Sequence, residues 1–259
     1  MHINHIKYSL IAIGLYITFA SCAVNNDNKL LIATSANMQF AIQEIVDAFK
    51  IDTGIECDLI ISSSGILTAQ IKEGAPFDIF ISADMKYPIE LFNSGFSKMP
   101  PKVYAYGRLV LWSLSDTLAP TLDILISNSV KHIAVANPKT APYGKAALEV
   151  LEKMNILPSV EDKLVYGEGI SQTNQFIISQ SSEMGFTAKS VVLSDKIAAS
   201  GNWLEISDTL HSPIEQGALI LNRSIAKDGK AEKFYNFLFS DKSKDILSKF
   251  GYITVQLQE

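Results

Sequence analysis

The chain has 259 residues, of which 47% are hydrophobic and 19% charged, so it is long enough to bury the core of one or two ordinary domains. Its 22 basic and 27 acidic residues give a net charge of −5, and the sequence holds no Lys/Arg cluster of the kind that nucleic-acid binding needs. The overall charge would not attract an anionic ligand, so an anion site would depend on local donors.

The N-terminal segment 1–28 is predicted to be a leader and a polar tether. An apolar run over 10–20 follows the basic Lys7, and its length is typical of a signal-peptide core and short for a membrane span. Cys22 follows in the sequence FASC, which resembles the lipobox of bacterial lipoproteins with Phe19 in place of the usual Leu. We expect an exported chain, with either a lipid on Cys22 or ordinary cleavage nearby.

The cysteines and histidines predict neither a disulfide nor a metal-cation site. If Cys22 carries lipid, Cys57 has no partner, and its strand-like surroundings IECDLII predict a buried small side chain. The four histidines show no metal-ligand spacing. We assign them no role in a site.

The first part of the exported chain has a βαβαβ pattern. Strands are predicted over 29–34, 55–62 and 77–84, and the two helices between them are predicted to end at Gly54 and Gly74. This order is typical of an open parallel sheet, and its nearly continuous apolar strands predict that helices cover both faces.

The rest of the chain predicts a second βα block between two long strands. The long strands are expected over 106–114 and 214–221, and two helices are expected within 230–252. Between the long strands, strands are predicted over 133–138, 163–169 and within 183–189, with helices from Pro142, over 170–180 and over 190–199. We therefore predict a leader over 1–28, a first lobe over 29–108 and 214–259, and a second lobe over 109–213. A single large α/β domain is the alternative.

Four strand–turn–helix junctions have similar polar turns, TSAN (34–37), SSSG (62–65), APYG (141–144) and EGIS (168–171). Such turns lie at the carboxyl ends of the strands, where open α/β sheets bind ligands. The free N–H groups and the positive dipole end of a helix favour an anion, and Ser and Asn side chains add donors. The turns contain no Lys or Arg, and Glu168 is expected to point outward. Singly, each turn also fits an ordinary helix cap.

Motifs of several other protein classes are missing from the sequence. It contains no GxxxxGK[ST] or GxGxxG nucleotide motif and no GxSxG nucleophile elbow. Neither His132 nor His211 is near the polar turns in sequence. We therefore predict no catalytic residue, and an exported hydrolase remains a remote alternative.

Four segments together resemble the periplasmic molybdate-binding proteins of bacterial ABC importers. They are GAPFDIFISAD (74–84), ANPKTAPYG (136–144), GEGISQT (167–173) and EMGFTAKS (183–190). The resemblance runs from about residue 29 to 254 and implies an α/β chain with the type II periplasmic-binding-protein fold, in which two lobes joined by two crossover strands enclose a ligand cleft. It also implies that neutral donors hold a tetrahedral oxyanion, without catalysis and without a cofactor.

The resemblance places the anion contacts at four main positions. The first is Asn37, in an AN pair with Ala36, and the second is Ser64, with Ser63 as a close competitor. The others are Tyr143 and the backbone N–H of Ile170. Some relatives supply a tyrosine from the later strand, where this chain has Ala188, so we expect the phenol of Tyr143 to replace it.

The implied ligand is molybdate or tungstate, and the implied partner is the permease of an ABC importer. We expect a monomer, in the periplasm or tethered by lipid to the outer face of a membrane, with no nucleic-acid partner. A receptor for sulfate or phosphate is the first alternative, and an adhesion or structural lipoprotein is another.

Overall fold

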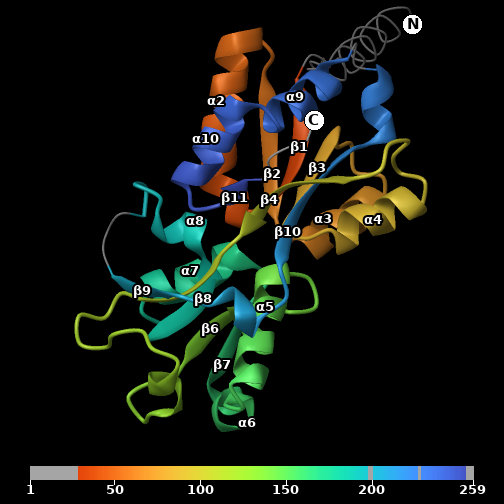
Figure 1. Cartoon of the computed structure of the whole chain (residues 1–259). Helices are drawn as coiled ribbons and strands as arrows, with labels where there is room; N and C mark the ends of the chain where they lie inside the picture. The colour runs from red at the N-terminus through yellow and green to blue at the C-terminus, as the bar shows by residue number, and fades with distance from the viewer. Residues whose placement is uncertain (1–28, 198–200, 227–228, 255–259) are drawn as a thin grey trace, which may run out of the picture.

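The computed structural model describes residues 29–197, 201–226 and 229–254. The predicted leader, tether and lipid attachment at Cys22 lie outside the described residues. Two sheets lie one above the other in Figure 1, and we call each sheet with its helices a lobe. Within the described ranges, none of the helices has the length and apolar character needed to cross a membrane.

Lobe 1 is built on a six-stranded sheet with the order β11-β4-β10-β3-β1-β2. The parallel strands β1 (Leu30–Ser35), β2 (Cys57–Ser62) and β3 (Ile79–Ser82) alternate with α2 (Gln39–Thr53) and α3 (Ser64–Lys72), which confirms the predicted βαβαβ order. Helix α2 ends at Gly54, whose φ of 71° is a left-handed conformation that glycine adopts without strain.

The C-terminal part of the chain completes lobe 1. Strand β10 (Ile214–Ile220) pairs antiparallel with β3 and with β4 (Lys102–Gly107), and β11 (Ile253–Thr254) pairs with β4. Helices α9 (Lys230–Leu238) and α10 (Asp241–Lys249) lie beside α2, where the rings of Phe49 and Phe234 stack edge to face at 5.1 Å. Their burial provides the core on this face of the sheet.

Lobe 2 is built on a five-stranded sheet with the order β7-β6-β8-β5-β9. Its strands are β5 (Leu109–Ser113), β6 (Ile133–Ala136), β7 (Leu164–Gly167), β8 (Met184–Ala188) and β9 (Asn202–Glu205). Its helices are α5 (Pro142–Lys153), α6 (Leu157–Val160), α7 (Ile170–Ile178) and α8 (Lys189–Val192). Short 3₁₀ turns cover Ala36–Met38, Asp123–Ile126, Glu161–Lys163, Asp208–Leu210 and Asn222–Ala226.

The long strand predicted over 106–114 is in fact two strands that belong to different sheets. Strand β4 ends at Gly107 and β5 begins at Leu109, so the chain passes between the lobes at Arg108. Backbone bonding continues across this point, since the N–H of Lys189 donates to the carbonyl of Arg108 at 2.9 Å. Strand β5 is buried throughout and β4 is partly buried, and the pattern of apolar residues alone does not show where the chain changes sheet.

Several local predictions were wrong or incomplete. Helix α4 (Lys86–Asn93) was missed; its Pro88 lies in the first turn, where proline is tolerated. Strands β9 and β11 were also missed, and α8 is a single turn rather than a helix over 190–199. Cys57 is only partly buried, and Ile60 and Ile61 are exposed, because β2 is an edge strand with one neighbour.

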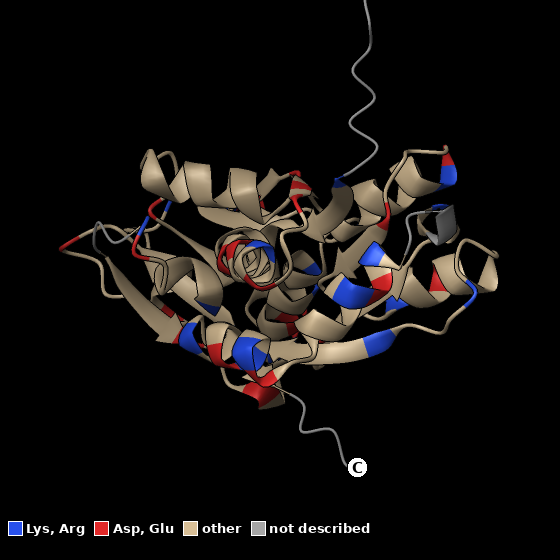
Figure 2. Cartoon of the chain, turned by 90° about the horizontal axis from the view of Figure 1, so that it is seen from above, with Lys and Arg blue, Asp and Glu red and all other residues tan. Residues whose placement is uncertain are grey.

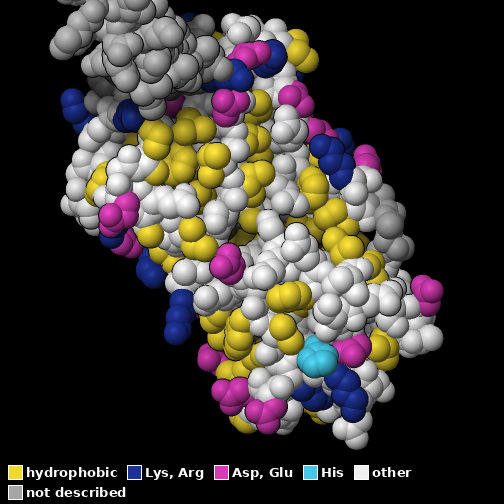
Figure 3. All heavy atoms as spheres, turned by 180° about the vertical axis from the view of Figure 1, so that it is seen from behind, with side chains coloured by type: hydrophobic (Ala, Val, Ile, Leu, Met, Phe, Trp, Pro, Cys, Tyr) yellow, Lys and Arg dark blue, Asp and Glu magenta, His cyan; other side chains and the backbone are white. Residues whose placement is uncertain are grey.

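The surface of the described residues carries charges of both signs. In Figure 2 the Lys/Arg and Asp/Glu residues are interspersed along the helices and loops. Viewed from behind in Figure 3, hydrophobic side chains gather in small groups over both lobes, with charged groups between them.

Candidate functional site

Residues from all four predicted turns meet in one small cavity between the lobes. Lobe 1 contributes Ser35, Ala36, Asn37, Ser63, Ser64 and Ala83, and lobe 2 contributes Ala141, Pro142, Tyr143 and Ile170. The structure thus brings together every residue that the sequence singled out for an anion site. It adds four lining residues that were not assigned from the sequence, namely Ser35, Ala83, Ala141 and Pro142.

The cavity is small and the lobes are in contact around it. Its volume, measured for the centre of a water-sized sphere, is about 10 Å³, close to what a single water needs. The N–H of Gly65 in α3 donates to the carbonyl of Thr140 in lobe 2 at 2.9 Å. The structure therefore has the two lobes drawn together over the turns.

Three hydroxyl groups that belong to cavity-lining residues are buried without a hydrogen-bond partner in the described part of the chain. They are the hydroxyls of Ser35, Ser63 and Tyr143. A buried hydroxyl that bonds to nothing costs about 1–3 kcal/mol, so folded proteins rarely leave several in one place. Their grouping points to an acceptor that binds among them.

Ser64 has a hydroxyl that is already used as an acceptor. The N–H of Ala83 donates to its Oγ at 3.0 Å, and this leaves the Ser64 hydrogen free to donate elsewhere. Ser63 immediately precedes α3 and has the unpartnered hydroxyl. Both serines line the cavity, and each has a hydroxyl hydrogen available to donate to a ligand.

Asn37 lines the cavity, but its side-chain amide is turned toward lobe 1. Its Nδ2 donates to Gln216 Oε1 at 2.8 Å and to the Tyr252 hydroxyl at 2.9 Å, which uses both amide hydrogens. Ser190 of lobe 2 donates to its carbonyl at 2.7 Å. Its backbone N–H, in the first turn of a 3₁₀ helix, therefore replaces the side chain as the candidate donor.

Gln216 and Tyr252 are supporting residues that the sequence analysis missed. Gln216 is fully buried in β10, and its Nε2 donates to the carbonyls of Ala83 and Ile214 at 3.3 and 3.2 Å. The available signal was a glutamine inside the apolar run IEQGALIL, which indicates a polar group that must be paired on burial.

Helix starts supply the remaining candidate donors. Ile170 is the first residue of α7 and Pro142 the first of α5. The leading N–H groups of a helix have no intrahelical partner, and because proline has no N–H, the first one in α5 belongs to Tyr143. Both starts also present the positive end of the helix dipole.

The Tyr143 phenol occupies space that a glycine leaves free at the crossover. A Cβ on Gly107 would lie 2.1 Å from the Tyr143 hydroxyl oxygen and 2.8 Å from Gln216 Nε2. Burial raises the pKa of Tyr143 well above its usual value, the Tyr252 phenol adds to the rise, and the nearby Asn37 side chain opposes it. The phenol thus remains a neutral donor at physiological pH.

Buried phenols predict a loss of stability in alkali. Burial raises the pKa of Tyr104, Tyr143 and Tyr252 in the folded protein, whereas in the unfolded chain tyrosine ionises near about pH 10. Their contribution to the free energy of unfolding is therefore complete below pH 10 and is lost as the pH rises further. We expect urea midpoints to fall from pH 9 to pH 11. Tyrosinate absorbance from these residues should appear only with unfolding, and early ionisation of every tyrosine in the folded state would contradict the assignment.

No charged side chain lines the cavity among the described residues. Glu168 is exposed, as expected, and its N–H is bonded to Gln172 Oε1 at 2.8 Å. Within the same ranges, no group of His, Cys, Asp and Glu is placed to hold a metal ion. The site therefore offers neutral donors and suits a ligand that has only acceptors.

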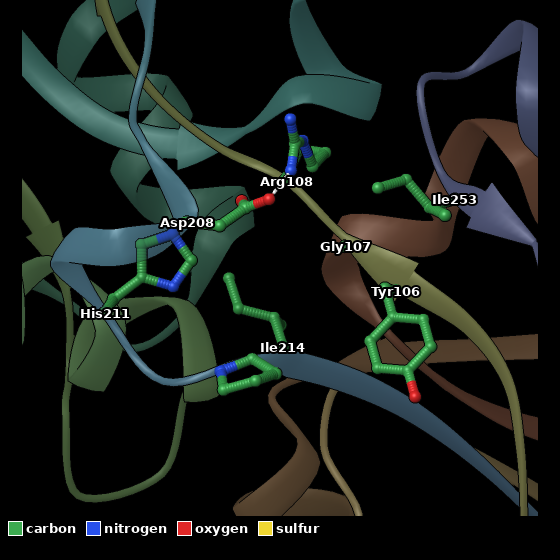
Figure 4. Close-up of a pocket in the computed structure, with 8 residues that line it drawn as sticks. Tyr106, Gly107, Arg108, Asp208, His211, Ile214 and Ile253 are labelled. Atoms are coloured by element: carbon green, nitrogen blue, oxygen red, sulfur yellow. Dashed lines mark hydrogen bonds and ion pairs between the residues drawn. The ribbon is translucent and has the colours of Figure 1, made fainter.

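A larger cavity lies at the crossovers, and none of the predicted site residues lines it. Its volume on the same measure is about 240 Å³, and its lining includes Arg108, Asp208, His211 and Ile214. Figure 4 shows Arg108 paired with Asp208 beside the chain at Gly107. Most of this lining is apolar and Arg108 is already paired, so the smaller cavity is the better candidate for an anion site.

Known proteins resemble this chain over most of its length. A family model described as bacterial extracellular solute-binding protein matches residues 30–253. The molybdate-binding protein ModA of Rhodobacter capsulatus is 34% identical, covering 87% of this chain and 88% of the relative. A substrate-binding lipoprotein of Bacillus subtilis, described as a putative ABC transporter component, is 26% identical, covering 95% of this chain and 98% of the relative.

A solved structure agrees with the arrangement of the two sheets. The periplasmic molybdate-binding protein of Azotobacter vinelandii superposes with a TM-score of 0.82 at 31% identity, covering 88% of this chain and 100% of that one. The predicted periplasmic-binding-protein fold is thereby confirmed.

Proposed function

Since this chain belongs to the bacterial extracellular solute-binding proteins, as a ModA-type member that serves an ABC importer, we propose that its ligands are molybdate and tungstate. It is a transport receptor and not an enzyme, and it needs no cofactor. The observation that carries the proposal is the group of unpartnered hydroxyls of Ser35, Ser63 and Tyr143 in one uncharged cavity.

The proposed ligand set draws on both lobes. Lobe 1 would donate from the backbone N–H of Asn37 and from the hydroxyls of Ser64 and Ser63. Ala36 and Ser35 would line the site beside Asn37. Lobe 2 would donate from Tyr143 and from the N–H of Ile170. An anion held from both sides stabilises the closed arrangement, which is the state we expect the permease to recognise.

A donor-only site distinguishes anions by protonation. Molybdate, tungstate and sulfate are fully deprotonated at neutral pH, whereas hydrogen phosphate carries a proton that needs an acceptor. A cavity lined by neutral donors should therefore reject phosphate. Sulfate remains the alternative ligand, because it differs from molybdate in size rather than in hydrogen bonding.

The affinity can be estimated from the donors. A hydrogen bond to a charged group is worth about 1.5–3 kcal/mol net. About six such bonds, less the cost of association and lobe closure, leave about −8 to −12 kcal/mol, which corresponds to micromolar to nanomolar binding.

The lobes would move about the two crossovers. We propose that lobe 1 comprises 29–108 and 214–259, that lobe 2 comprises 109–213, and that the chain bends near Arg108 and Pro213. Two connections favour a hinge motion over free separation of the lobes. We propose a monomer, since one chain supplies all the donors named above.

Export and anchoring rest on the leader. The family is extracellular, and the Bacillus subtilis relative is described as a lipoprotein, which supports a lipid on Cys22 of this chain. We expect membrane-extracted protein to have the mass of a chain that begins at a lipidated Cys22. An unmodified mass, with the protein released on cell fractionation, would leave a soluble periplasmic receptor.

Isothermal titration calorimetry tests the ligand. We expect tight one-to-one binding of molybdate and tungstate to the purified mature chain, with sulfate weak and phosphate silent. A strong heat of binding for sulfate, with none for molybdate, would support the anion site but would make sulfate its ligand. If none of the four anions gave heat, the helix starts would be ordinary caps.

A further inference from the structure

Beside the anion cavity, two segments meet across the lobes without lining the cavity themselves. Gly65, in the first turn of α3, donates its N–H to the carbonyl of Thr140 at 2.9 Å. Thr140 directly precedes Ala141, the first cavity-lining residue of lobe 2. The contact therefore connects lobe 1 to the segment that leads into α5.

This contact is possible only because residue 65 is glycine. A Cβ there would lie 2.7 Å from the Tyr87 hydroxyl oxygen, 2.9 Å from Thr140 Cα and 3.0 Å from the Thr140 carbonyl oxygen. Two of these atoms are backbone and cannot rotate away. The lobes thus approach each other at this point more closely than any other residue type would allow.

Tyr87 adds a second bond at the same place. It lies in α4 of lobe 1, is 8% exposed, and donates its hydroxyl to the carbonyl of Lys139 at 3.0 Å. Its N–H is bonded to Asp84 Oδ1 at 3.3 Å, and Lys86 Nζ lies 4.9 Å from its ring centroid. These lobe 1 contacts fix the ring while its hydroxyl reaches lobe 2.

The hydroxyl keeps its hydrogen under physiological conditions. Burial raises the pKa of Tyr87, and the carboxylates of Asp84 and Glu90 raise it further. Tyr87 therefore acts as a donor to Lys139 throughout the neutral range, and this bond is independent of pH there.

We propose that Tyr87 is a positioning residue that retains the bound anion. Through Lys139 and Thr140 it holds the start of α5, and with it Tyr143, against lobe 1 when the lobes are closed. Tyr87 does not line the cavity, so it would act on how long the closed state lasts and not on the anion itself. The inference rests on the proposed anion-binding function.

Stopped-flow kinetics of molybdate binding separates this role from a general loss of structure. We expect Tyr87→Phe to raise the dissociation rate about threefold to tenfold, the range for one neutral hydrogen bond. The association rate should stay within about twofold, because the anion meets the open protein before this bond forms.

Tyr235→Phe is the matched control. Tyr235 is also a buried tyrosine of lobe 1, and the backbone group that acts on its hydroxyl belongs to Lys102 in the same lobe. The substitution deletes a buried tyrosine hydroxyl of lobe 1 but none of the described hydrogen bonds between the lobes. We expect lower stability with an unchanged dissociation rate.

Gly65→Ala is the second variant. Its added Cβ must displace backbone, so we expect a larger rise in dissociation rate than for Tyr87→Phe. Alanine is the better helix former, but its Cβ would also lie 2.7 Å from the Tyr87 hydroxyl oxygen within lobe 1. We expect these opposing effects to leave the urea midpoint without molybdate little changed. A dissociation rate equal to wild type in both variants would overturn the proposal while leaving anion binding intact.

Hydrogen exchange at the Gly65 amide keeps the test independent of the ligand. We expect slow exchange with molybdate present, and faster exchange in Tyr87→Phe but not in Tyr235→Phe. If molybdate did not bind at all, the proposed function would fail. Gly65 amide exchange in wild type, Tyr87→Phe and Tyr235→Phe, compared without anion, would then test the Tyr87 contact by itself. Fast exchange in every wild-type sample would exclude the contact.

Discussion

Tyr143→Phe is expected to weaken molybdate binding about 10- to 150-fold and to leave the unliganded protein as stable as before or more stable. The first effect is the loss of one hydrogen bond to a charged ligand, about 1.5–3 kcal/mol. The second follows because the Tyr143 hydroxyl is buried without a partner, so its removal relieves a desolvation cost. Calorimetric titration and urea unfolding of the same samples measure the two quantities.

Tyr104→Phe is the matched control for this variant. The Tyr104 hydroxyl is also buried and unpartnered among the described residues, but Tyr104 does not line the cavity. Its removal should produce the same gain in stability with no change in affinity. Equal losses of affinity in both variants would mean that the tyrosines act through packing, and Tyr143 would not be a ligand.

Gly144→Ala is expected to abolish measurable molybdate binding and to lower the free energy of unfolding by about 1–3 kcal/mol or more. A Cβ at this position would lie 1.9 Å from the carbonyl oxygen of Ala136 and 2.6 Å from its carbonyl carbon. Both atoms belong to the end of β6, so relief requires α5 to move away from the sheet. The donors at the start of α5 would move with it.

Lys145→Ala controls for disturbance of α5. Lys145 is the next residue, its side chain is exposed, and its only described ion pair is with Glu149 at 3.6 Å in the same helix. Such surface pairs contribute little, so stability should change by less than about 0.5 kcal/mol. Affinity should also persist, because the site relies on neutral donors. A large loss of binding in Lys145→Ala would show that this cation attracts the anion.

The neutral character of the cavity has a consequence for salt. Because no Lys or Arg of the described residues lines it, the attraction is local and short-ranged. We expect molybdate affinity to change less than about threefold between 0.05 and 0.5 M sodium chloride, since screening acts mainly on exposed charges. A steep salt dependence in calorimetry would point to a cationic contact instead.

Most of the secondary structure could be predicted from the sequence because its signals are local. One helix ends at Gly54, a residue typical of helix C-termini, and another begins at Pro142, a residue typical of the first helical position. Helix α4 was not predicted because its apolar periodicity is short and interrupted by Pro88. The change of sheet at Arg108 was not predicted because the residue pattern of a strand does not show which sheet the strand joins.

The sequence by itself determined which donors stand at the four helix starts: polar turns without Lys or Arg, with Tyr143 and the serines among them. Only the tertiary structure decided how those donors are used. The Asn37 amide faces Gln216 and Tyr252, which are 179 and 215 residues away along the chain. The Ser35 hydroxyl is left unpartnered in the shared cavity. Donor type is a property of each residue, whereas donor availability depends on long-range contacts that burial makes obligatory.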